Sequence, residues 1–96
     1  MGNNKYKVLI IEDDRKISSF IETLLEANGY SALCADKCAQ GLLLFASHMP
    51  DLVILDLGLP DRDGLEFIRE IRKNSVAPII VLSARTTEND KIQALD

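Results

Sequence analysis

Three continuous apolar runs occur along the chain, at residues 8–11, 52–55 and 79–82. A run without polar alternation is typical of a strand that is buried on both faces, as in a parallel sheet. A weaker strand candidate at residues 30–35 mixes Ser31 with apolar residues, as an edge strand does. The pattern therefore predicts four strands, of which the one at 30–35 lies at an edge.

Between these runs the apolar residues recur at helical spacing. The first set follows the spacing i, i+3, i+4, i+7, i+8 and predicts an amphipathic helix with one apolar stripe: Ile17, Phe20, Ile21, Leu24 and Leu25. Asp14 can cap the start of this helix, and Gly29 can end it. Further helices are predicted from about residue 37 to 48, after Gly64, and from about Glu88 onward.

The alternation of strands and helices predicts an α/β fold with a doubly wound parallel sheet, flavodoxin-like, in the strand order 2-1-3-4. A chain of 96 residues allows one domain. The chain stops inside the last helical pattern, so we expect residues 1–96 to be a C-terminally truncated domain. The sheet edge that this leaves open predicts pairing with a second copy, a homodimer.

Acidic residues follow two of the strands, Glu12, Asp13 and Asp14 after the first and Asp56 after the third. In open α/β sheets, ligands bind beyond the carboxyl ends of the strands where the strand order reverses, here between these two strands. Two like charges about 4 Å apart cost about 4 kcal/mol at an effective dielectric of 20. Such a cluster needs raised pKa values or a cation, and an all-oxygen ligand set favours Mg²⁺.

A carboxylate beside Mg²⁺ can act as a nucleophile toward phosphorus and form an aspartyl phosphate. Ser83, at the end of the fourth strand, would share this rim and could donate a hydrogen bond to a phosphoryl oxygen. Taken singly, acidic residues after strands are often caps or turn residues, and Asp14 is expected to be one. Acidic residues at the ends of two neighbouring strands together predict a cation site.

Composition narrows the function classes. The formal net charge is −4, with 15 acidic residues against 11 lysines and arginines, so no basic surface predicts nucleic-acid binding through this chain. Two cysteines are too few for a disulfide framework and are expected to be free thiols in a reducing compartment. No apolar run approaches the roughly 20 residues that cross a bilayer. We therefore expect a cytoplasmic protein without a membrane partner.

Together, these segments resemble the receiver domain of bacterial two-component response regulators. The resemblance rests on four pieces that span nearly the whole chain: IIEDD at 10–14, DLVILDLGLP at 51–60, DG at 63–64 and PIIVLSA at 78–84. Residues 56–69 and 82–92 further resemble OmpR-type regulators of potassium-transport (Kdp) operons. The resemblance implies that a fifth strand and a last helix are missing from this chain.

The resemblance also implies roles at matching positions. Asp56 would be the phosphoacceptor and, with Asp13 and the backbone carbonyl of Gly58, would ligate Mg²⁺. Glu12 would act through a water molecule. Ser83 would supply the switch hydroxyl, and the backbone N–H groups of Gly58 and Ala84 would hold phosphoryl oxygens.

The implied partner is a sensor histidine kinase, with an output through a C-terminal DNA-binding domain outside this chain. The implied role is that of a phosphoryl acceptor rather than an enzyme. A lysine and an aromatic switch residue of the family would lie beyond Asp96.

Other readings fit less of the sequence. A phosphatase of the haloacid-dehalogenase type needs a second aspartate two positions after the first, where this chain has Gly58. A nucleotide-binding domain needs a glycine-rich loop after the first strand, where this chain is acidic. A receiver-like module that binds partners without phosphorylation stays open for this fragment, because the family's lysine is missing.

Overall fold

The computed structural model describes residues 5–59, 63–82 and 92–95, the last of these as backbone only. The elements in chain order are β1 (Lys7–Ile11), α1 (Arg15–Ala27), β2 (Ser31–Ala35), α2 (Cys38–His48), β3 (Leu52–Asp56), α3 (Gly64–Arg72), β4 (Ile79–Leu82) and β5 (Ile92–Leu95). The predicted strands and first three helices all form. The longest described helix, α1, has 13 residues, and no described helix is long and apolar enough to cross a membrane.

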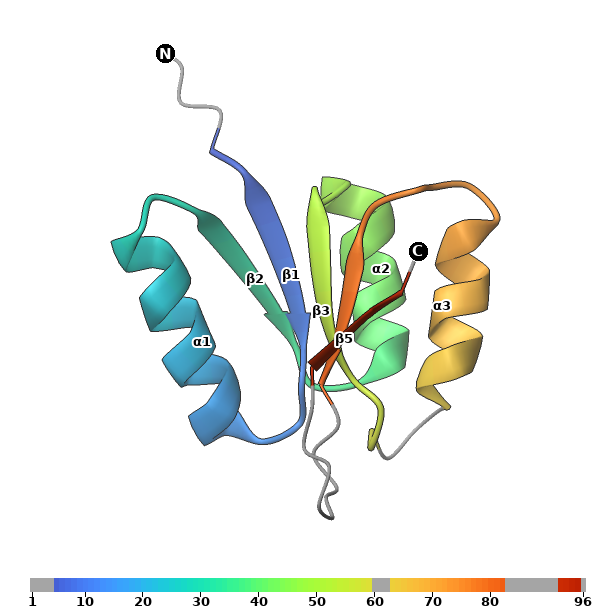
Figure 1. The fold of residues 1–96 in the computed structure, drawn as a ribbon, viewed down its shortest axis with the longest axis horizontal. Helices are drawn as coiled ribbons and strands as arrows, with labels where there is room; N and C mark the ends of the chain where they lie inside the picture. The colour runs from blue at the N-terminus through green and yellow to red at the C-terminus, as the bar shows by residue number, and fades with distance from the viewer. Residues whose placement is uncertain (1–4, 60–62, 83–91, 96) are drawn as a thin grey trace.

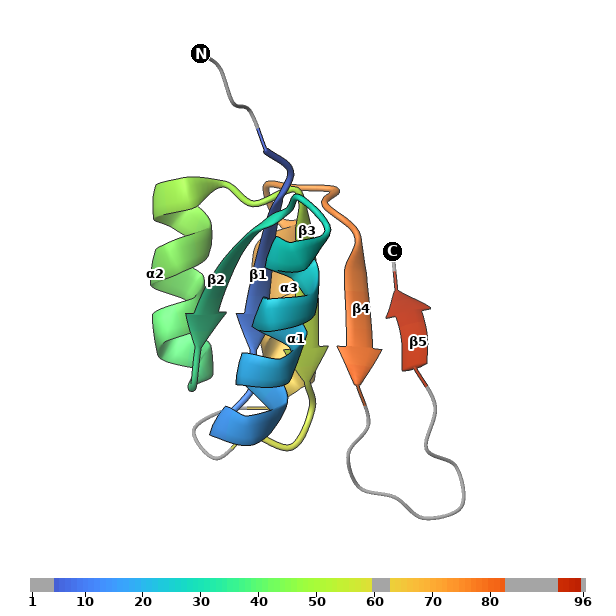
Figure 2. The same ribbon diagram turned by 90° about the vertical axis from the view of Figure 1, so that its left-hand side faces the viewer.

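The strands form one sheet in the order β2-β1-β3-β4-β5 (Figures 1 and 2). The first four strands are parallel, so the predicted order 2-1-3-4 is confirmed. β1 is hydrogen-bonded to β2 on one side and to β3 on the other, with Ile11 beside Leu55. The carboxyl ends of β1 and β3 therefore lie next to each other in the middle of the sheet.

The prediction of a helix from about Glu88 onward is wrong for residues 92–95, which form β5. This strand runs antiparallel to β4 and pairs Ile92 with Leu82 and Leu95 with Ile79. An unpaired strand edge presents a row of backbone N–H and C=O groups, and pairing with β5 satisfies those of β4. The edge on which the predicted homodimer relied is therefore occupied, and the homodimer itself stays a prediction.

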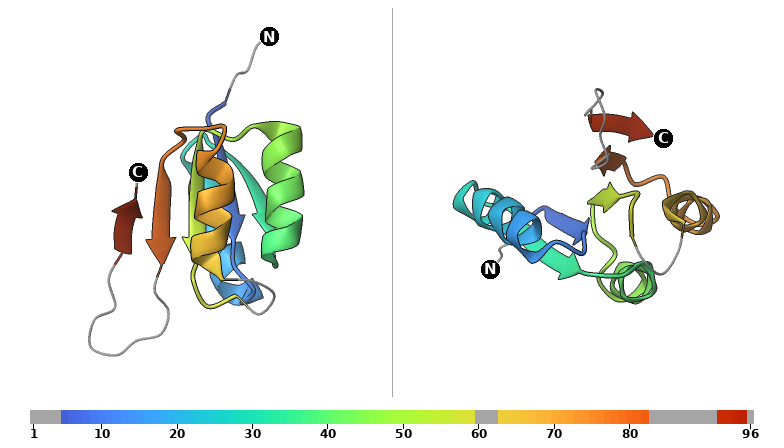
Figure 3. Two further views of the ribbon diagram at one scale, coloured as in Figure 1. Left: turned by 90° about the vertical axis from the view of Figure 1, so that its right-hand side faces the viewer. Right: turned by 90° about the horizontal axis from the view of Figure 1, so that it is seen from below.

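The helices cover the two faces of the sheet unequally. Figure 3 shows α1 alone on one face and α2 with α3 on the other. The main core lies on the α2–α3 face and contains Leu9, Ile11, Ala35, Cys38, Val53, Leu55, Leu59, Phe67, Ile71, Ile79 and Val81. This alternation along β3 and β4 follows from the two-residue period of a strand.

The α1 face is only partly covered. Val8 and Ile10 of β1 are buried there, but Ile54 and Ile80 are only half-buried. On α1 itself, Phe20 of the predicted apolar stripe is 65% exposed. The prediction of strands buried on both faces is therefore correct for β1 and wrong for β3 and β4, because one helix does not span the width of the sheet.

Two aspartates fix the helices that start near the strand ends. Asp14 accepts hydrogen bonds from the backbone N–H groups of Lys16 and Ile17, which caps α1. Asp63 accepts from the N–H of Leu65 at 3.0 Å and caps α3. Such caps satisfy N–H groups that have no partner within the helix. They anchor α1 and α3 at the rim where β1 and β3 end.

Candidate metal centre

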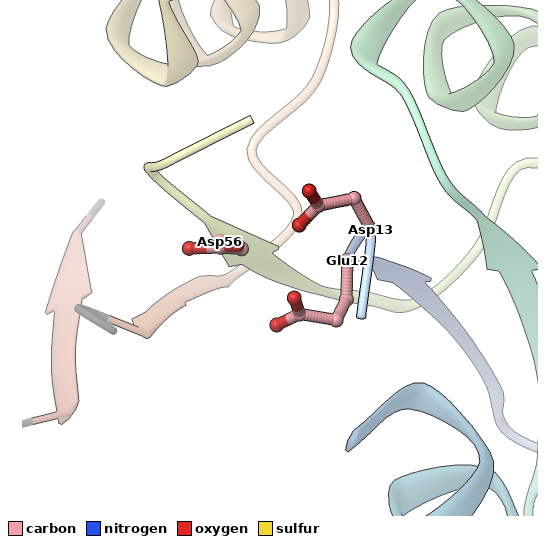
Figure 4. Close-up of side chains that lie close together, drawn as sticks. All are labelled: Glu12, Asp13 and Asp56. Carbon is pink, nitrogen blue, oxygen red and sulfur yellow. The ribbon is translucent and has the colours of Figure 1, made fainter. Parts of the chain in front are cut away.

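Three carboxylates converge where β1 and β3 end. Asp56 is the last residue of β3, and Glu12 and Asp13 directly follow β1. Each residue offers one carboxylate oxygen, and these three oxygens all lie within 4.8 Å of one another. Figure 4 shows the side chains projecting from the two strand ends into a common region. Glu12 and Asp56 are buried, with exposed fractions of 4% and 3%, whereas Asp13 is exposed.

Backbone N–H groups orient the two buried carboxylates. The N–H of Gly58 donates to Asp56 Oδ1 at 3.0 Å, and the N–H of Asp14 donates to Glu12 Oε2 at 3.0 Å. The N–H of Glu12 itself donates to the carbonyl of Ala35 at the end of β2, also at 3.0 Å. Because these donors belong to the main chain, the orientation of the carboxylates follows from the path of the backbone just after each strand.

Charge accumulates in this buried region. Burial raises the pKa of Glu12 from 4.5 to about 7, and the neighbouring charges of Asp56 and Asp13 act in the same direction. The hydrogen bond from the Asp14 backbone opposes the increase. A carboxyl group that retains its proton near neutral pH marks a place where positive charge is favoured. Of the two expected outcomes, a raised pKa is found at Glu12, and the cation stays a prediction.

The donor set fits a hard divalent cation. All three side chains offer oxygen, which Mg²⁺ prefers, and one or two carboxylates with several waters are its usual protein coordination. The partly open position of Asp13 leaves room for such waters. Asp14 stands outside the cluster and serves as the helix cap, as predicted.

Two of the predicted site residues, Ser83 and Ala84, lie outside the described residues. Leu82, the last described residue before them, pairs with Asp56 in the sheet. The N–H of Leu57 also donates to the carbonyl of Leu82 at 3.4 Å. The end of β4 is thus tied to the loop that follows Asp56.

A polar cavity of about 260 Å³ beside Glu12 was not foreseen from the sequence. It lies between α1 and β2 and is lined by Glu12, Arg15, Ser18, Ser19, Glu22, Cys34, Ala35, Asp36 and Gln40. Its residues come from one helix face, one strand end and the start of α2, so no sequence motif joins them. The sequence feature that could have indicated this cavity is Arg15, the first residue of α1, because it places a positive charge directly after the acidic run at 12–14.

The raised pKa of Glu12 leads to a pH-dependent stability. We expect the free energy of unfolding of the metal-free protein to fall as the pH rises from about 4.5 to about 7. In this window Glu12 is protonated in the folded protein and ionised in the unfolded chain, so unfolding releases a proton and higher pH favours it. Urea titrations in EDTA at several pH values measure the slope. Glu12→Gln should flatten it, and an unchanged slope would contradict this origin.

Comparison with known proteins shows to which family this chain is related. The model of the response regulator receiver domain matches residues 8–96. The KDP operon transcriptional regulatory protein KdpE of Escherichia coli (strain K12) is 55% identical over 89 residues, which cover 93% of this chain and 40% of that protein. The transcriptional regulatory protein KdpE of Staphylococcus aureus is 47% identical over 90 residues, covering 94% and 39%. The chain thus spans about 40% of the length of these curated relatives.

Solved structures show the same architecture. The receiver domain of the Francisella response regulator 1452 superposes with a TM-score of 0.78 at 33% identity, covering 88% of this chain and 70% of that one. The chemotaxis response regulator CheY4 of Vibrio cholerae superposes with a TM-score of 0.81 at 26% identity, covering 88% and 72%.

Proposed function

This chain belongs to the family of response regulator receiver domains, and we propose that it accepts a phosphoryl group on Asp56 in a reaction that requires Mg²⁺. The observation that carries the proposal is the cluster of Glu12, Asp13 and Asp56 at the ends of two adjacent parallel strands. Two of its members are buried and held by backbone N–H groups, and one has a raised pKa. These features describe a site prepared for a cation and for a carboxylate nucleophile.

The proposed roles follow from position. Asp13 and Asp56 would hold Mg²⁺ directly, with the carbonyl of Gly58, and Glu12 would act through a water molecule. The bound cation would neutralise charge on the phosphoryl oxygens. The Asp56 carboxylate attacks phosphorus, a new O–P bond forms, and the bond from phosphorus to the donor breaks, with its electron pair leaving on the donor. The N–H of Gly58 keeps the carboxylate oriented during this step.

The rest of the proposed activity concerns a longer protein. The donor would be a sensor histidine kinase in the cytoplasm, and the output would be transcription of a potassium-transport operon through a DNA-binding domain outside this chain. The relatives named KdpE, which extend well beyond the matched region, support this proposal. Ser83 and Ala84 would contact the phosphoryl group with a hydroxyl and a backbone N–H. The chain itself would act as an acceptor rather than an enzyme.

The proposal is tested by incubating the chain with Mg²⁺ and acetyl phosphate and recording the intact mass. We expect the gain of one phosphoryl group, and EDTA should prevent it. The Mg²⁺ concentration for half-maximal acceptance should rise at least about tenfold in Asp13→Asn, because a neutral amide oxygen replaces a negatively charged ligand. Asp14→Asn is the matched control, since asparagine also caps helices and residue 14 lies outside the cluster.

Two results would argue against the proposal. If the unmodified chain gains no phosphoryl group with Mg²⁺ present, acceptance from a small donor is excluded. If Asp13→Asn and Asp14→Asn shift the Mg²⁺ requirement equally, the cluster does not bind the cation as proposed.

A further inference from the structure

The loop that follows Asp56 lies directly against the first residue of α3. That residue, Gly64, is buried. A Cβ atom placed on Gly64 would lie 2.6 Å from Leu57 Cδ2 and 3.3 Å from Leu57 Cα. It would also lie 3.6 Å from Leu55 Cδ2, which is ordinary contact. The Cδ2 atom is the end of a flexible side chain and can turn aside, whereas the Cα atom is backbone and must yield by a few tenths of an ångström. A larger residue at position 64 therefore displaces the Leu57 side chain and presses on the Leu57 backbone.

The backbone conformation gives no other reason for glycine here. Among the described residues, Gly29 is the glycine with a positive φ, and Gly64 has an ordinary helical start that other residues adopt. Within a helix, alanine is favoured over glycine by about 1 kcal/mol. The glycine at position 64 is therefore explained by the space that Leu57 occupies.

Leu57 lies in the chain between the Asp56 carboxylate and the Gly58 N–H group that orients it. It is bonded covalently to Asp56 on one side and to Gly58 on the other, and the N–H of Gly58 donates to Asp56 Oδ1 at 3.0 Å. The N–H of Leu57 itself donates a hydrogen bond to the carbonyl of Leu82 at 3.4 Å. A shift of the Leu57 backbone must therefore move the Gly58 amide relative to the Asp56 carboxylate.

We propose that Gly64 is a positioning residue, whose missing side chain seats Leu57 so that Asp56 and Gly58 keep the geometry that Mg²⁺ binding requires. This inference rests on the proposed function, since it concerns the same cation site. Gly64 lies outside the acidic cluster, and the atoms nearest to a Cβ placed on it belong to Leu57 and Leu55, the two residues that flank Asp56. The proposal therefore predicts an effect on cation affinity from a residue that offers no ligand.

Gly41 in α2 provides a matched control. A Cβ atom there would lie 2.6 Å from Ile11 Cδ1, 3.1 Å from Ile11 Cγ1 and 3.4 Å from Phe67 Cε1. The closest approach equals that at Gly64, but all three neighbours are side-chain atoms. Ile11 precedes Glu12, but its nearest atoms and that of Phe67 are side-chain atoms, so Gly41→Ala should cost stability through crowding in the core without pressing on the backbone.

The experiment compares the unmodified chain, Gly64→Ala and Gly41→Ala. The Mg²⁺ dissociation constant is measured by calorimetry, the exchange of the Gly58 amide proton by NMR in EDTA, and stability by urea titration. We expect both variants to be destabilised, and only Gly64→Ala to weaken Mg²⁺ binding, by about tenfold, as loss of a residue that orients a ligand does. The Gly58 amide should exchange faster in Gly64→Ala alone, before any metal is added.

A second substitution tests whether Leu57 transmits the effect of Gly64→Ala to the cation site. Adding Leu57→Ala to Gly64→Ala removes the Cδ2 atom at 2.6 Å and should restore most of the Mg²⁺ affinity. If Gly64→Ala is unfolded in buffer, the measurements are made in sucrose, which favours the compact state.

The outcomes separate this inference from the function on which it rests. An Mg²⁺ dissociation constant in Gly64→Ala equal to that of the unmodified chain would overturn the positioning role, as would an equal weakening in Gly41→Ala. Failure of the unmodified chain to bind Mg²⁺ would instead overturn the proposed function.

Discussion

Asp56→Asn is expected to abolish phosphoryl acceptance completely and, at the same time, to stabilise the metal-free protein. The loss follows because a carboxamide is not a nucleophile toward phosphorus at neutral pH, whereas the carboxylate is. The gain in stability follows because Asp56 and Glu12 are both buried and close together. Once Glu12 ionises, above about pH 7, removing the Asp56 charge relieves a repulsion that exists only in the folded state.

The substitution should leave the local structure intact. Asparagine keeps the Oδ1 atom that accepts the hydrogen bond from the N–H of Gly58, and its size matches that of aspartate. The pKa of Glu12 should fall in the variant, since the charge and hydrogen bond of Asp56 both raise it. The decline of stability with rising pH should therefore become shallower.

Intact mass after incubation with acetyl phosphate and Mg²⁺ measures the first effect, and urea titration in EDTA at about pH 8, where Glu12 is ionised, measures the second. Asp36→Asn is the control, since Asp36 also follows a strand end but is exposed and outside the cluster. A phosphoryl group on Asp56→Asn would show that another residue is the acceptor. A variant less stable than the parent would show that the Asp56 charge is held favourably without metal.

Phe67→Ala is expected to lower the free energy of unfolding by about 3–5 kcal/mol, the range for a fully buried aromatic residue. Phe67 lies on α3 with 0% exposure and belongs to the core between the sheet and the two helices α2 and α3. A Cβ atom on Gly41 would lie 3.4 Å from Phe67 Cε1, so the ring lies next to the position where α2 carries no side chain. Removal of the ring leaves a cavity whose walls cannot collapse without moving a helix.

A loss of this size is a large share of the stability of a small domain, which amounts to about 5–15 kcal/mol in total. Urea titration of the metal-free protein at pH 7 measures it, with Leu65→Ala as the control on the same helix. Leu65 is 47% exposed, so its truncation should cost far less. Similar losses in the two variants would mean that the α3 face of the core is loosely packed.

Local signals in the sequence predicted most of the fold. The cap at Asp14 and the helix end at Gly29, with φ of +90°, act through neighbouring residues, and for that reason they can be recognised from the sequence alone. The convergence of Glu12 and Asp56 was also predictable, because the rule for ligand sites in parallel sheets depends only on strand order.

Features that depend on distant partners were not predictable. The helix expected after Glu88 is replaced over residues 92–95 by β5, since pairing with the edge of β4 outweighs local periodicity. An apolar stripe shows which side of α1 avoids water but not whether a neighbour covers it, and Phe20 is left largely exposed. Likewise, the sequence predicted a helix only after Gly64, whereas Asp63 caps this helix and Gly64 is its first residue and lies against Leu57.

The two strands that carry the carboxylates are inner strands of the sheet, with a neighbour on each side. Fraying of β2 or β5 at the edges leaves the ladder between β1 and β3 closed, so Glu12 and Asp56 stay together through local opening. Only an opening close to global unfolding separates them. Hydrogen exchange at Ile10 or Ile54 would thus report on the lifetime of the site itself, and a cation bound there slows this exchange by mass action.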